Sequence, residues 1–70
     1  MADDDDLVSR FTYHPPKNGQ AERYENLRAQ GLHLARLVSE HTPPSREQSL
    51  ALTHLEQAVM WANAAIARHE

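Results

Sequence analysis

Planar and cationic side chains occur together between positions 11 and 28, and this stretch is the part of the sequence best suited to binding chemistry. Nucleobases stack on aromatic rings, and each such contact contributes about 1–3 kcal/mol. Arginine binds phosphate through paired donors, whereas lysine binds it as a point charge. Flat rings beside a few cations are what recognition of a small nucleotide requires. The planar residues are Phe11, Tyr13 and His14, and the cations are Lys17, Arg23 and Arg28.

Each of these side chains also has a purely structural interpretation. Phe11 and Tyr13 would then pin the N-terminal segment onto the rest of the fold. An arginine on a helix surface would pair with a neighbouring carboxylate, as Arg23 would with Glu22. The residues alone leave both interpretations open.

Catalytic and metal-binding patterns are weak in this sequence. The five histidines form no HExxH motif, and no two of them lie four residues apart on one helix. Ser45 and Ser49 lie outside any nucleophile-elbow motif. Two glycines are too few for a phosphate-binding loop. The sequence therefore predicts no catalytic residue, no metal site and no cofactor, and an enzyme is not expected.

The charge of the chain is divided between an acidic N-terminus and a nearly neutral body. Positions 3–6 are all aspartate, and residues 7–70 carry six carboxylates against seven lysines and arginines. Such a body lacks the dense basic surface of a protein that binds long nucleic acid. No apolar run is long enough for a membrane span, and the acidic start is unlike a secretory signal. Cysteine is absent, so neither a disulfide nor a thiolate metal site supplements the core.

The N-terminal part of the chain divides into a tail and an arm. Residues 1–9 are interpreted as an acidic disordered tail. Residues 10–19 are expected to form an extended arm, because Pro15 and Pro16 disfavour helix in the residues before them. The arm ends in a turn that finishes at Gly19.

Two helices follow, over about residues 20–41 and about residues 45–68. Two adjacent prolines separate them, and Ser45 with Gln48 three residues later matches a capping box. Two long helices with a short connection predict an antiparallel hairpin. The expected fold class is therefore all-α, with residues 10–70 forming a single helical hairpin domain.

Apolar residues at helical spacing predict the seam between these helices. Gly31 lies within the first stripe and costs its helix about 1 kcal/mol relative to alanine, which close approach of another backbone would offset. The first stripe is Tyr24, Leu27, Gly31, Leu34 and Val38, and the second is Leu52, Leu55, Val59, Ala62 and Ile66.

The second helix is apolar around nearly its whole circumference, which one partner helix cannot cover. We therefore expect a homo-oligomeric helical bundle in which the second helices pack together, with Met60 and Trp61 in the core between subunits. Thr53 and Asn63 are polar residues within this apolar zone and must find partners there. They would either fix the register between subunits or contact a ligand held between subunits.

The segments FTYHPPKNGQAERYENLR and LALTHLEQAVMWANAAIAR resemble the short hairpin-domain proteins of bacteriophages. That family includes cyclic-oligonucleotide sponges known as anti-CBASS proteins, and the related anti-Thoeris sponges share the hairpin. The resemblance covers about residues 10–69, and the second segment is its most specific part.

The resemblance implies a compact oligomer, commonly a hexamer, that binds signalling nucleotides between subunits without cleaving them. Bacterial immune synthases make cyclic di- or trinucleotides on infection, and a sponge in the cytoplasm of the infected host lowers their free concentration. The resemblance implies Tyr13 or Phe11 as the residue that stacks on a base and Lys17 as the phosphate partner. Thr53, Asn63 and Arg68 would contribute from the second helix.

Two other functions remain open from the sequence. The apolar helix of a small oligomeric protein-interaction module would bind a protein partner in a groove, with no nucleotide ligand. In a purely structural oligomer, the arm would only pack against the hairpin.

Overall fold

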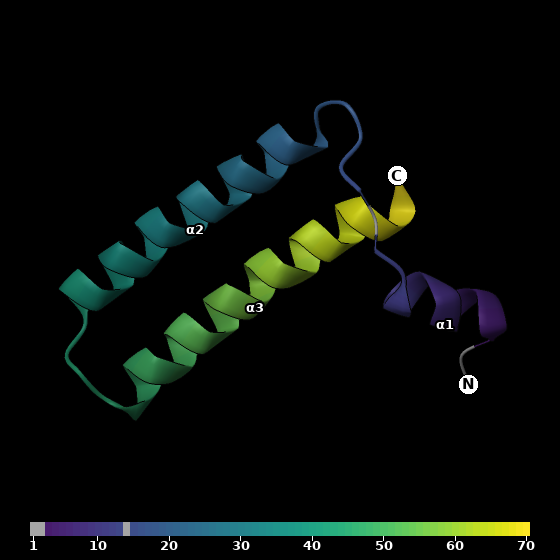
Figure 1. The fold of residues 1–70 in the computed structure, drawn as a ribbon. Coiled ribbons are helices and arrows are strands. Elements are labelled where there is room, and N and C mark those ends of the chain that lie inside the picture. The colour runs from purple at the N-terminus through teal and green to yellow at the C-terminus, as the bar shows by residue number, and fades with distance from the viewer. Residues whose placement is uncertain (1–2, 14) are drawn as a thin grey trace.

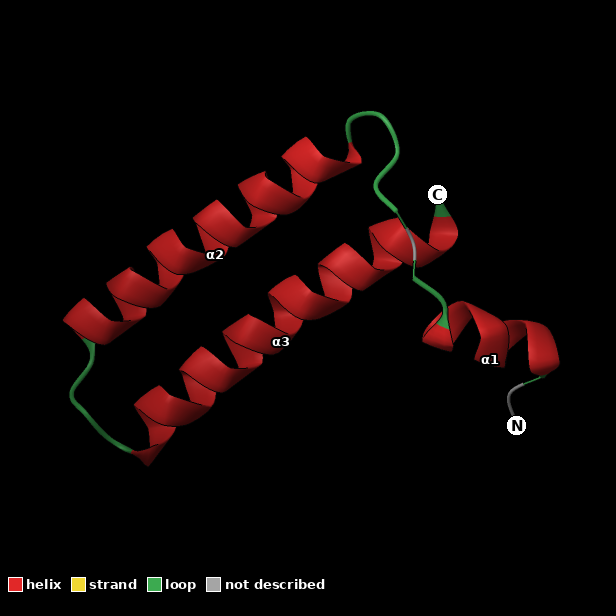
Figure 2. Cartoon of the chain, in the orientation of Figure 1, coloured by secondary structure: helices red, strands yellow, loops and turns green. Residues whose placement is uncertain are grey.

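Three helices make up the fold, and the second and third form an antiparallel hairpin (Figure 1). The computed structural model describes residues 3–13 and 15–70 of the 70-residue chain. The helices are α1 (Asp4–Phe11), α2 (Gln20–His41) and α3 (Arg46–His69). The described residues contain no strand (Figure 2), so the expected all-α hairpin is confirmed. In this part of the chain, each helix is too short or too polar to pass through a lipid bilayer.

Residues 4–9, which were predicted to belong to a disordered tail, lie in helix α1; residues 1–2 of that predicted tail lie outside the described residues. The Asp3 carboxylate caps the helix by accepting a hydrogen bond from the Asp6 amide at 2.8 Å. The aspartates of the first turn complement the helix dipole, and Asp6 pairs with Arg10 one turn later at 2.9 Å. Aspartate is poor inside a helix but favourable at its start, which is why the acidic run nucleates structure here. Phe11 is the last residue of α1 and does not belong to the arm.

The arm that follows α1 lies beside the C-terminal part of α3, where Tyr13 and Pro16 line one cavity with Ala64 and Ala67, and it then turns into α2 (Figure 1). Gly19 has a φ of +81°, in the left-handed region that favours glycine. The Gln20 amide donates to the Lys17 carbonyl at 3.0 Å, and the Gln20 side chain accepts from the Lys17 amide at 2.9 Å. Gln20 is only 4% exposed. The turn predicted from the sequence is thus present, and it is fixed by a buried glutamine.

The corner between α2 and α3 is held by hydrogen bonds around Ser45 and Gln48. Ser45 Oγ accepts from the Gln48 amide at 3.1 Å, which confirms the predicted cap. The Gln48 side chain does not return to Ser45 but reaches the end of α2. Its Nε2 donates to the carbonyl oxygens of Ser39 at 3.3 Å and Thr42 at 3.0 Å. Only one of the two hydrogen bonds of a capping box is therefore formed. The Gln48 side chain, which would make the second, instead joins the corner to the end of α2.

The seam between α2 and α3 follows the two predicted stripes with one change. Ala35 is half-buried at the seam, whereas Leu34 is exposed. The helices approach closely at Gly31, where an added Cβ would lie 2.6 Å from Val59 Cγ2. A side chain of α3, not its backbone, therefore fills the space that Gly31 leaves.

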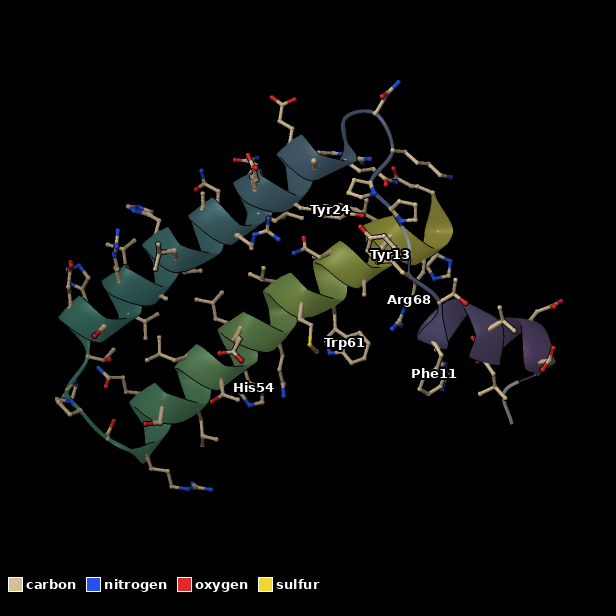
Figure 3. All side chains as sticks on the ribbon, viewed as in Figure 1. Phe11, Tyr13, Tyr24, His54, Trp61 and Arg68 are labelled. Carbon is tan, nitrogen blue, oxygen red and sulfur yellow. The ribbon has the colours of Figure 1, made fainter. Side chains whose placement is uncertain are left out.

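The hairpin is a single layer of helices with both faces open. The radius of gyration of the chain, α1 included, is 15.3 Å, against about 11 Å for a compact chain of this length. Among the described residues, no apolar side chain is fully buried. Trp61 is 59% exposed and projects from the side of α3 that faces away from α2 (Figure 3). One chain alone thus leaves most of the apolar circumference of α3 uncovered.

Candidate functional site

A cavity of about 340 Å³ opens where the arm lies beside the C-terminal part of α3. Tyr13 comes from the arm and is 80% exposed. Arg28 lies one turn beyond Tyr24 on α2, and Asn63 reaches the cavity from α3. Small side chains on α3 leave the space open. The full lining is Tyr13, Pro16, Tyr24, Arg28, Asn63, Ala64 and Ala67.

Two residues that line this cavity each have a polar atom that is buried without a partner. The Tyr24 hydroxyl oxygen and the Asn63 Oδ1 are inaccessible to solvent, and neither has a hydrogen-bond partner among the described residues. Buried polar atoms in folded proteins are nearly always paired. An unpaired one costs about 1–3 kcal/mol. Each helix therefore contributes to the cavity one residue whose oxygen is unpaired but covered by the surrounding side chains.

A second cavity of about 500 Å³ continues along the hairpin. Arg28 and Asn63 line both cavities, so they mark the boundary between a polar end and an apolar groove. The groove is lined mainly by aliphatic side chains of α2 and α3, with Met60 at its edge and Glu56 as its acidic residue. A groove of this kind suits an apolar partner surface better than a charged ligand.

A cluster of charged residues lies beside the polar cavity, at the start of α2 and the end of α3. The Arg23 guanidinium forms a two-pronged ion pair with the Glu70 carboxylate, with one of its N–H···O distances at 2.9 Å. Lys17 Nζ donates to the main-chain oxygen of Glu70 at 2.6 Å. The hydrogen bond from Arg23 lowers the pKa of Glu70, and the charge of Lys17 lowers it further. Lys17 and Arg23, two of the cations that were expected to bind phosphate, are therefore both bound to Glu70 in the free chain.

The structure brings together only part of the predicted site. Tyr13, Arg28 and Asn63 line one cavity, whereas Phe11 is 86% exposed on α1. Arg68 projects from the side of α3 that faces away from α2 (Figure 3). Thr53 is exposed on α3 and lines neither cavity. His14 lies outside the described residues.

Sequence reasoning missed two features of the site. Tyr24 was assigned to the apolar stripe, and its ring does lie there. Its hydroxyl, however, is buried with no hydrogen-bond partner among the described residues. Glu70 was assigned no role, yet it takes the place at Arg23 that Glu22 was expected to fill. A tyrosine on an otherwise aliphatic stripe is the one sequence signal that indicates the first feature.

The described residues form a helical hairpin with an N-terminal helix and an arm that carries Tyr13. The family model described as "Acb2/Tad1, hairpin domain" matches residues 3–67. The chain belongs to this family, which is that of the anti-CBASS and anti-Thoeris sponges. The match begins at the residue that caps α1, so α1 is part of the family domain. Comparison with curated proteins gives no match, and comparison with solved structures gives none either.

Proposed function

We propose that this protein sequesters cyclic di- or trinucleotide messengers of bacterial anti-phage defence without cleaving them. Membership of a family known for cyclic-nucleotide sponges supports the proposal. The observation that carries it is the single cavity lined by Tyr13, Arg28 and Asn63. The protein would act in the cytoplasm of an infected bacterium, as a phage immune-evasion factor.

In this proposal, each lining residue has a distinct role. Tyr13 stacks on a base, because its ring is exposed at the cavity mouth. Arg28 binds phosphate through paired donors. Lys17 and Arg23 reach the ligand only after Glu70 has been displaced, since both are bound to it in the free chain.

We further propose that the protein acts as a homo-oligomer, with a hexamer as the assembly that the resemblance implies. The support is the absence of a fully buried apolar side chain among the described residues. A single small hairpin gains too little from burial to be stable by itself. Sister copies that cover the apolar groove would supply the missing core and would close the pockets between them.

Isothermal titration with a panel of cyclic di- and trinucleotides tests the binding proposal. Tyr13→Ala should weaken binding of the best ligand about tenfold or more, because a base–aromatic stack is lost. Arg28→Gln should weaken it about tenfold, because a charge-assisted hydrogen bond is lost. Matched controls are Phe11→Ala and Arg36→Gln, which alter an exposed aromatic residue and an arginine outside the cavities. No binding across the panel would overturn the proposal.

A protein-interaction module remains the second candidate function. The observation that favours it is the exposed Trp61 on the outer side of α3, where a helical partner would fit. Sedimentation equilibrium of the purified protein separates the two functions. A closed oligomer supports the sponge, whereas a folded monomer that binds no cyclic nucleotide supports the interaction module.

A further inference from the structure

The side of α3 that faces away from α2 carries a second stripe of side chains, which we call the outer stripe. Two sets of residues repeat along it every seven positions and so share one helix face. Each of these residues is exposed in the single chain, and none lines the polar cavity or the apolar groove. The first set is Glu47, His54, Trp61 and Arg68, and the second is Ala51, Ala58 and Ala65.

We infer that the outer stripe is the interface with a second copy of this chain, whose α3 packs against it in the antiparallel direction. A two-fold axis then passes next to Ala58, near the middle of the stripe, and the same surface is used by both copies. The inference deepens the proposed homo-oligomer by naming one of its interfaces. It does not depend on nucleotide binding.

The charges at the two ends of the outer stripe select the antiparallel direction. Glu47 lies in the first turn of α3 and Arg68 in its last turn. In the antiparallel pair, Glu47 of each copy lies opposite Arg68 of the other, which gives two symmetry-related ion pairs. In a parallel pair, each residue would meet its own like charge, which disfavours association. The stripe is therefore complementary to itself in one direction only.

The side chains between these ends complement one another in size. The same register places the Trp61 ring opposite the His54 ring of the second copy, and it places Leu50 opposite Ala65. Ala58 lies next to the two-fold axis, where its small side chain allows the helix axes to approach to about 8 Å, the lower end of the usual range. Trp61 is 59% exposed in the single chain, and this packing covers it.

Site-specific cross-linking tests the register, because the chain has no cysteine of its own. With a mild oxidant and no nucleotide, Ala58→Cys should form a disulfide-linked dimer, since the two copies of this position lie within the reach of a disulfide. Ala65→Cys is the matched control, an exposed alanine of the same stripe. Its two copies would lie about 22 Å apart along the axis, at about 1.5 Å per residue. Non-reducing electrophoresis should show Ala58→Cys linking at least tenfold faster.

Charge reversal tests the same register by sedimentation equilibrium at low salt. Glu47→Arg and Arg68→Glu should each weaken association about tenfold, because both symmetric ion pairs become repulsive. The double reversal Glu47→Arg/Arg68→Glu should restore association. Each reversal also loses a favourable interaction with the helix dipole, and the double reversal loses both, so recovery must come from pairing between copies. Arg36→Glu, exposed on α2, is the control that should leave association unchanged.

The outcomes separate this inference from the proposed function. Equal linking of Ala58→Cys and Ala65→Cys would overturn the antiparallel register, and so would a double reversal that associates no better than the single ones. An oligomeric wild type would in either case leave the proposed homo-oligomer standing with another interface. A monomeric wild type would overturn both. Titration of the wild type with cyclic nucleotides decides the sequestration proposal separately.

Discussion

Replacement of Gly31 by alanine tests the helix seam, because two opposing effects meet at this position. Alanine favours a helix interior over glycine by about 1 kcal/mol. The added Cβ would lie 2.6 Å from Val59 Cγ2, which is far inside van der Waals contact. Val59 has one strongly preferred rotamer in a helix, so the helices must separate. Overpacking of this kind costs about 1–3 kcal/mol, and we expect Gly31→Ala to destabilise the fold by up to about 2 kcal/mol.

The sign of the effect should reverse when Val59 is shortened. In a Val59→Ala background the obstructing methyl is gone, so Gly31→Ala should stabilise the fold by about 1 kcal/mol. The four variants of this cycle are compared by urea unfolding with far-UV circular dichroism at one fixed protein concentration, since stability of an oligomer depends on concentration. If Gly31→Ala stabilises the wild-type background as much as the Val59→Ala background, the helices do not approach at Gly31 and the described seam is wrong.

Three further predictions concern the ends of the helices. Ser45→Ala should cost about 1 kcal/mol in thermal or urea unfolding, because the Gln48 amide loses its cap; an unchanged stability would contradict the described corner. Gly19→Ala should cost about 1–2 kcal/mol, because the residue has a positive φ, and a neutral result would show that the turn differs. Since Arg23 lowers the pKa of Glu70 in the folded chain, the ion pair stabilises above the ordinary glutamate pKa of about 4.3 and is lost as pH falls through the lower folded value. Wild type and Glu70→Gln should therefore differ at neutral pH and converge in acid, and parallel pH profiles would refute the pairing. If Lys17 and Arg23 bind phosphate, Glu70→Gln should also tighten nucleotide binding, which titration at low salt would detect.

The hairpin was predictable because strong local signals agree with the global fold. Two prolines separate two long segments that have apolar residues at helical spacing, and Ser45 caps α3 as the sequence predicts. Local chemistry of this kind needs no knowledge of distant residues. The seam shows the limit of such signals, because Ala35 lies half-buried there and the predicted Leu34 is exposed, and the rotation of a helix about its axis depends on tertiary packing.

Helix α1 was not predicted because the density of negative charge was given more weight than the preference of aspartate for the first positions of a helix. An aspartate run resembles a solvated tail by composition, yet Asp3 is a good cap and Asp6 meets Arg10 at the correct spacing. The candidate site was predicted only in part, because some of its features depend on tertiary packing. Three of the residues chosen by type, Tyr13, Arg28 and Asn63, line one cavity, whereas the burial of the Tyr24 hydroxyl depends on tertiary packing that no single-residue rule provides.

Equilibrium dialysis with recovery of the bound nucleotide tests the central claim most directly. The purified protein is dialysed against each cyclic di- and trinucleotide, heat-denatured, and the released ligand is identified by chromatography. The account predicts that at least one cyclic nucleotide is retained and is returned uncleaved, in the amount that was bound. Retention of none, or the return of a linear or hydrolysed product, would contradict it.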